Sequence, residues 1–156
     1  LCIMRGSNGG KKDPKHQWPS YKWCAISNDG GRTWTEPEPW TYSNGENFYS
    51  PASMSMLFEH SSGRIFWIGN ISESNCRANH PRWPLVIGEV DPDTAGLIKD
   101  TVITIDTKQP DEADVNLSHW HAIEDRQTGD IHLPMARASK GYKSRAPVLY
   151  VIQVAD

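Results

Sequence analysis

Two histidines, His119 and His121, have the type and spacing that suggest chemistry most directly. They flank Trp120 in the stretch 117–124, which is predicted to be a strand, so alternation places both imidazoles on one face. An imidazole titrates near neutral pH and can act as a general acid or base, or it can bond a ligand hydroxyl. Together with His132 on the next predicted strand the pair can also bind a metal, but no carboxylate or cysteine completes a familiar ligand spacing. A third interpretation is that both histidines are polar lining.

Three arginines are the candidates for binding an anion. Arg5 ends the first predicted strand, Arg82 lies in the stretch 79–85, and Arg77 lies in the loop that leads to it. A guanidinium group keeps its proton and makes bidentate, charge-assisted hydrogen bonds to a carboxylate. The alternative is that each arginine is a solvated residue at the end of a strand, and the residues alone leave both interpretations open.

The stretch 27–34 reads S-x-D-x-G-x-T-W and predicts how a neighbouring hairpin is built. Its fixed positions are Ser27, Asp29, Gly31, Thr33 and Trp34. Asp29 favours a tight turn, and Gly31 permits a positive φ without strain. Trp34 begins the next strand and can pack over the turn, so we expect a β-hairpin held by its own side chains.

These five positions together resemble the Asp-box of sialidases and other BNR-repeat β-propellers, in which the box is structural and lies away from the active face. The resemblance implies an all-β fold, a partial six-bladed β-propeller of four-stranded antiparallel blades. Residues 1–156 would form about two and a half blades at its C-terminal part. The missing N-terminal blades of the same protein are then expected partners, and the expected location is secreted or periplasmic.

The resemblance also implies roles for the arginines. An arginine stands in a comparable place to Arg5 in sialidases, and the stretch 79–85 is similar to their N-R-x-P-L strand start, which matches Arg82. Both would hold the carboxylate of a substrate in one pocket on the propeller axis, and Arg77 would help to bind an acidic sugar. The general acid and the first arginine of such a site are expected upstream of Leu1.

The stretch 117–124 is similar to the strand that carries the tyrosine nucleophile of sialidases, with His119 in the place of the tyrosine. The neutral tyrosine avoids repulsion from the substrate carboxylate, and a histidine cannot simply take over that role. This departure argues against strict sialidase activity. The sequence therefore predicts an exo-acting, sialidase-like glycoside hydrolase for an acidic or polar sugar, with His119 as the catalytic candidate, His121 beside it and no metal or cofactor. A non-catalytic glycan-binding propeller and a protein-binding scaffold are the alternatives.

The elements that must position these residues are predicted to be short strands, because aromatic and β-branched runs alternate with turn signals. No segment has a helical period over three turns. Loop 6–19 is interpreted as a polar, glycine-rich insertion, and the last long loop carries Tyr142 and Arg145 as further candidates. The predicted strands are 1–5, 20–27, 50–58, 64–70, 83–90, 98–105, 117–124, 129–136 and 147–154.

Composition excludes several classes of function. The chain has 156 residues and a net charge of −3 with scattered basic residues, which argues against nucleic acid as a partner. No apolar run is long enough to span a membrane. Three cysteines cannot form a complete disulfide framework, and free thiols are expected, although Cys2 and Cys24 lie on neighbouring predicted strands.

Overall fold

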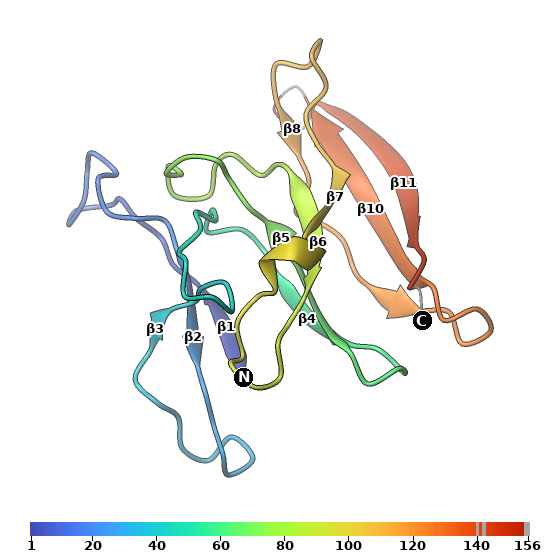
Figure 1. Ribbon diagram of the computed structural model, residues 1–156. Coiled ribbons are helices and arrows are strands. Elements are labelled where there is room, and N and C mark those ends of the chain that lie inside the picture. Colours follow the sequence, from blue (N-terminus) through green and yellow to red (C-terminus); the bar gives the residue numbers. More distant parts are fainter. Residues whose placement is uncertain (140, 142, 155–156) are drawn as a thin grey trace.

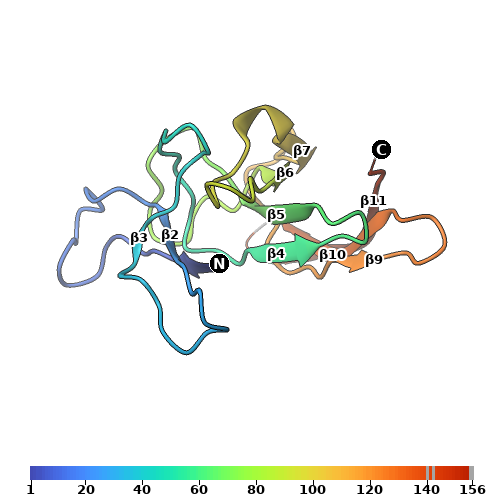
Figure 2. The same ribbon diagram turned by 60° about the horizontal axis from the view of Figure 1, so that its bottom comes forward.

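The computed structural model describes residues 1–139, 141 and 143–154, which form three antiparallel sheets. The first sheet has the order β1 (Cys2–Arg5), β2 (Lys22–Ala25) and β3 (Glu38–Pro39). The second has the order β4 (Met56–Glu59), β5 (Ile65–Asn70), β6 (Leu85–Glu89) and β7 (Ile103–Asp106). The third contains β8 (Val115–Asn116), β9 (Ile123–Glu124), β10 (Ile131–Ser139) and β11 (Ser144–Ile152), and both β8 and β9 pair with β10. The sheets follow one another across the molecule in chain order, from β1 to β11 (Figure 1), and Figure 2 shows the same order from a second direction.

The two central strands of the middle sheet, β5 and β6, are buried on both faces. Phe66 and Ile68 of β5 pack in a core shared with the third sheet, whereas Trp67 between them packs in a second core with residues of the first. Val86 of β6 likewise joins the core on the side of Trp67. This arrangement explains why β5 reads as a continuous apolar run, since neither of its faces meets water.

Aromatic rings fill the core between the first and second sheets. The ring of Trp67 lies 5.3 Å from that of Trp40 and 6.1 Å from that of Phe48, measured between centroids. Such tilted and edge-on pairs add to the free energy of simple area burial. Much of the aromatic content of the chain therefore serves packing.

The predicted all-β class is confirmed, and the described residues contain no α-helix, only the 3₁₀ turn η1 (Lys99–Thr101). Three strand predictions need correction. The run 50–58 is a strand only from Met56, and 98–105 is a strand only from Ile103, because η1 occupies its first half. The run 117–124 is not one strand, because β8 ends before it and β9 begins at Ile123. Leu117 and Trp120 both enter the core, and side chains three positions apart cannot do so on a regular strand of period two. Strands β3 and β8 lie outside the predicted runs, and Trp34 does not begin a strand, because β3 starts only at Glu38.

The hairpin between β2 and β3 has the side-chain bonds that its sequence suggests. Asp29 Oδ1 accepts from the amide of Thr33 at 2.9 Å, and its Oδ2 accepts from the hydroxyl of Thr33 at 2.7 Å. Ser27 Oγ accepts from the amide of Gly31 at 2.8 Å, and Trp34 Nε1 donates to the carbonyl of Gly31 at 3.0 Å. The two bonds from Thr33, followed by the bond that Ser27 Oγ donates to Asp29 Oδ1 at 2.8 Å, lower the pKa of Asp29 to about 2. The hairpin is thus closed by local contacts.

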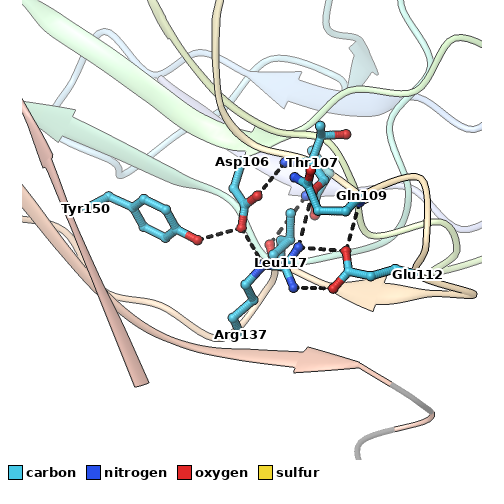
Figure 3. A network of polar contacts seen from close by, with 8 residues as sticks. Asp106, Thr107, Gln109, Glu112, Leu117, Arg137 and Tyr150 are labelled. Atoms are coloured by element: carbon cyan, nitrogen blue, oxygen red, sulfur yellow. Dashed lines mark hydrogen bonds and ion pairs between the residues drawn. The ribbon is translucent and has the colours of Figure 1, made fainter. Parts of the chain in front are cut away.

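A polar cluster joins the second sheet to the third (Figure 3). Arg137 of β10 donates from Nε to Asp106 of β7 at 2.8 Å, and from Nη2 to Glu112 at 2.8 Å. Its Nη1 bonds the second oxygen of Glu112, and the hydroxyl of Tyr150 on β11 donates to Asp106 at 2.5 Å. The bonds from Arg137 lower the pKa of Glu112 to about 2. We call this set of four residues the Arg137 cluster.

The structure also bears on the predictions about the cysteines and about membrane-spanning segments. Cys2, Cys24 and Cys76 are free thiols, as expected. Within the described residues, no helix has the length and apolar character needed to cross a membrane.

Candidate functional site

A hollow of about 470 Å³ lies between the loop that joins β5 to β6 and the neighbouring strands β8 and β10. We call it the guanidinium hollow. Two of the predicted site residues, Arg77 and Arg82, line it, and Trp83 contributes an aromatic ring. The loop contributes Asn75 and His80 as further polar lining, β8 contributes Asn116, and Asp114 lies just before β8.

Arg82 is held in place at the border of this hollow. Its Nε donates to the carbonyl of Asn79 at 3.1 Å, and its Nη1 donates to the hydroxyl of Ser118 at 2.9 Å. Ser118 in turn donates to the side-chain oxygen of Asn116 at 2.8 Å. A guanidinium group fixed in this way loses less conformational entropy when it binds a ligand.

The side chain of Arg77, in contrast to that of Arg82, is exposed. Its backbone pairs with that of His80 through two hydrogen bonds, of 2.8 and 3.1 Å, which close a tight loop. Ala78 in this loop has a φ of 52°, a conformation that alanine rarely adopts. The amide of Ala78 donates to Asn8 Oδ1 at 2.8 Å, so a side chain from loop 6–19 helps to hold the strained loop.

Loop 6–19 is attached to the wall of the hollow by further polar bonds. Asn8 Nδ2 donates to the carbonyl of Cys76 at 2.8 Å. Asn75 Oδ1 accepts from the amide of Ser20 at 2.8 Å, and its Nδ2 donates to the carbonyl of Trp18 at 3.0 Å. The predicted polar insertion is therefore a support for the segment that carries Arg77.

A buried asparagine connects the chain segments that carry Arg82 and Ser118. Asn70 is fully buried, and its Nδ2 donates to the carbonyls of Pro84 at 3.0 Å and Leu117 at 3.3 Å. Its Oδ1 accepts from Ser53 Oγ at 2.8 Å. Because a buried amide is costly unless it is bonded, this arrangement fixes the relative position of three chain segments.

Lys22 belongs to the same buried polar layer. Its side chain is completely buried, and Nζ donates to the carbonyls of Pro51 at 3.0 Å and Ser53 at 2.7 Å. Burial, and to a lesser degree the charge of Arg5, lowers the pKa of Lys22 to about 7. The two carbonyls match the two N–H groups of the neutral amine, so the site can accommodate the uncharged form.

The two histidines lie in a different hollow, of about 720 Å³, which we call the histidine hollow. His119 and His121 are exposed, and Trp120 between them is buried. Arg145 of β11 lines the same hollow. A smaller hollow of about 220 Å³, the bridging hollow, is lined by His119, Ala136, Ala138 and Arg145. Since Ala138 also lines the guanidinium hollow, the three hollows adjoin along β10.

The structure therefore brings the predicted site residues together in two groups, Arg77 with Arg82 and His119 with His121. Arg5 is exposed at the end of β1, paired with Lys22 of β2, and among the described residues it lines neither of these hollows. Tyr142 lies outside the described residues. The hairpin that contains residues 27–34 lies below the first sheet in Figure 1, away from β8.

The set of metal ligands considered from the sequence does not assemble in the part of the chain that the structure describes. No group of three histidine, cysteine, aspartate or glutamate side chains gathers there. His132 instead lies 3.9 Å from the carboxylate of Asp125.

Sequence reasoning missed four lining residues, Asn75, His80, Asp114 and Asn116. One signal for two of them was present, because Asp114, Asn116 and Ser118 alternate as polar residues next to the apolar Leu117. Such alternation indicates a strand with one polar face. Asp114 is the carboxylate of the hollow, and it accepts from the amide of Gly141 at 3.2 Å.

Comparison with protein-family models, with curated proteins and with solved structures gives no match for this chain.

Proposed function

We propose that the guanidinium hollow binds the anionic group of an acidic sugar. The observation that carries this proposal is the position of Arg77 and Arg82 on one hollow of about 470 Å³, a size suited to a small ligand. Guanidinium groups bind carboxylates in a bidentate manner, and Arg82 is already oriented by Asn79 and Ser118. Asn116 supplies an amide for a hydroxyl group, and Trp83 supplies a ring on which the apolar face of a sugar can stack.

The fuller proposal is that the chain is part of a sialidase-like six-bladed propeller that hydrolyses a glycoside of such a sugar. The succession of three antiparallel sheets and the bonded Asp-box hairpin support it. Glycoside hydrolysis needs a group that protonates the leaving oxygen and a group that activates water or attacks the anomeric carbon. Asp114 and His80, which line the guanidinium hollow, and His119, which lines the bridging hollow, are titratable groups available for these roles.

A second candidate function is glycan binding without hydrolysis. It is favoured by one observation, that His119 lines the histidine and bridging hollows and not the guanidinium hollow. In that case Arg77 and Arg82 bind the acidic sugar and no reaction follows.

The experiment that tests the proposal measures binding and turnover separately. Galacturonate and N-acetylneuraminate are titrated into the protein by calorimetry, and aryl glycosides of both sugars are assayed for release of the aryl alcohol. The Arg82→Gln variant should weaken binding at least tenfold, because a charge-assisted bond contributes about 1.5–3 kcal/mol. Arg126→Gln removes the same charge from a surface turn and should leave binding unchanged. Binding without turnover would select the second candidate, and failure to bind either sugar would contradict both.

A further inference from the structure

Four residues form a single row across the edge of the third sheet. Arg82 forms a parallel bridge with Asn116, Asn116 pairs with Ala138, and Ala138 pairs with Arg145. Residues that pair side by side in a ladder project to the same face of the sheet. The two arginines therefore stand on one face, at the two ends of the row.

The spacing and the sizes of the middle residues leave room between the arginines. Adjacent strands lie about 4.8 Å apart, so three steps separate the backbones of Arg82 and Arg145 by roughly 14 Å. Ala138 has no side chain beyond its Cβ and forms a low floor. The lining of the two hollows agrees with this open space above Ala138. The guanidinium hollow is lined by Arg82 and Ala138, and the bridging hollow is lined by Ala138 and Arg145.

Groups that suit sugar hydroxyls lie along this trough. Asn116 forms part of the row, and His119 lines the bridging hollow beside Arg145. A single acidic sugar carries one carboxylate and can engage only one end of the trough at a time. A chain of acidic sugars places carboxylates at both ends while its hydroxyl groups face the amide and the imidazole.

We propose that this trough binds an acidic oligosaccharide, with Arg82 and Arg145 each holding the anionic group of a different sugar unit. The inference rests on the proposed function, since it takes an acidic sugar as the ligand, and it extends the ligand from one acidic unit to at least two. The second contact is intramolecular once the first has formed, so it raises affinity without a new entropic cost of association.

The test compares monomers with trimers. Galacturonate and trigalacturonate form one series, and N-acetylneuraminate and its α2,8-linked trimer form the other, all titrated at the same low ionic strength. In the series that binds, the trimer should bind about tenfold more tightly than the monomer, as expected for one added charge-assisted contact. The Arg145→Gln variant should bring the ratio of the two dissociation constants close to one. Arg126→Gln, the matched loss of a surface charge, should keep the ratio of the wild type.

The outcomes separate this inference from the proposed function. If the monomer binds and Arg82→Gln weakens it, but the trimer gains nothing over the monomer, the trough is wrong and the acidic-sugar site stands. If neither series binds, both proposals fail. If a thymidylate oligomer of the same charge as the trimer binds as tightly, the trough recognises phosphate chains and the sugar assignment is overturned. The Arg145→Lys variant keeps the charge and should retain part of the trimer's advantage in affinity over the monomer. It therefore controls for misfolding of the Arg145→Gln variant.

Discussion

Two arginines near the junction of the second and third sheets have different surroundings. Arg137 is enclosed by the carboxylates of Asp106 and Glu112, and its side chain is 18% exposed. The contacts described for Arg82 are with a carbonyl and a hydroxyl, and its side chain borders a hollow. Arg137 joins two sheets through carboxylates of the chain itself. Arg82 is oriented by Asn79 and Ser118 at the border of a cavity, which is the arrangement on which the proposed acidic-sugar site depends.

The two regions are also physically connected. Lys108 donates to the carbonyl of Glu112 at 2.9 Å, and its ammonium group lies 5.6 Å from the ring centroid of Trp83. Trp83 lines the guanidinium hollow. The Arg137 cluster therefore supports one wall of the proposed site. For this reason the free energy of unfolding and the ligand affinity of each variant must be measured separately.

The largest expected effect is on stability, from the Arg137→Met variant. Two mostly buried carboxylates would lose their cation, which typically costs about 3–5 kcal/mol, and partial exposure places this site near the lower value. Urea denaturation should show a loss of about 3 kcal/mol in the free energy of unfolding. Arg126→Met is the control and should be nearly neutral. A loss no greater than that of the control would contradict the structural role of the cluster.

The next largest effect concerns the pH dependence of stability through Lys22. Its pKa is about 7 in the folded protein and 10.5 when unperturbed. The unfolded state therefore binds more protons between these values, and stability rises with pH across the window. Relative to Lys22→Met, which has no amine, the wild type should gain about 2 kcal/mol in the free energy of unfolding between pH 7 and pH 9. If the free energies of unfolding of the two proteins changed in parallel with pH, the pKa of the buried amine would not be lowered, and the prediction would be wrong.

A smaller effect is expected at the rim of the guanidinium hollow. Arg77→Gln removes an exposed cation, so affinity for the acidic sugar that binds should fall about tenfold or less. The free energy of unfolding should stay within about 0.5 kcal/mol of the wild type, as for most surface substitutions. Calorimetric titration and urea denaturation check the two parts. A large loss of stability with unchanged binding would assign Arg77 a structural role.

The most local effect is a change in the titration of one carboxyl group. Arg137 lowers the pKa of Glu112 to about 2, from an unperturbed value of 4.5. The carboxyl ¹³C resonance of Glu112 should therefore stay in its ionised position down to pH 3 in the wild type. In Arg137→Met it should titrate at higher pH, closer to its unperturbed pKa, while the hydrogen bond from the amide of Gln109 remains. Asp29 is the internal control, because its pKa of about 2 depends on Thr33 and Ser27. A Glu112 resonance that titrates identically in both proteins would remove the basis of the comparison.

The sequence predicted the features that depend on local pattern. Apolar runs such as 64–70 gave most of the strands, because alternation and turn residues are local signals. The hairpin at 27–34 was predicted for the same reason, since its bonds join residues no more than four positions apart.

The features that depend on pairing between distant parts of the chain could not be predicted from local sequence pattern. The bridge between Arg82 and Asn116 joins segments 34 positions apart in the chain, and nothing local specifies it. The irregular course of 117–122 follows from the packing of Leu117 and Trp120 in the shared core, which overrides the alternating pattern. For this reason the sequence indicated the arginines and the histidines but could not place them in separate hollows.

The most direct test of the central claim is an NMR titration of the arginine side chains. The Nε–Hε resonances of Arg77, Arg82 and Arg137 are followed at pH 6 while galacturonate and N-acetylneuraminate are added in turn. With the sugar that binds, the resonances of Arg77 and Arg82 should shift together along one saturable curve, while that of Arg137 stays in place. Equal shifts at Arg82 and Arg137, or no saturable shift at Arg82 with either sugar, would contradict the assignment of the guanidinium hollow as an acidic-sugar site.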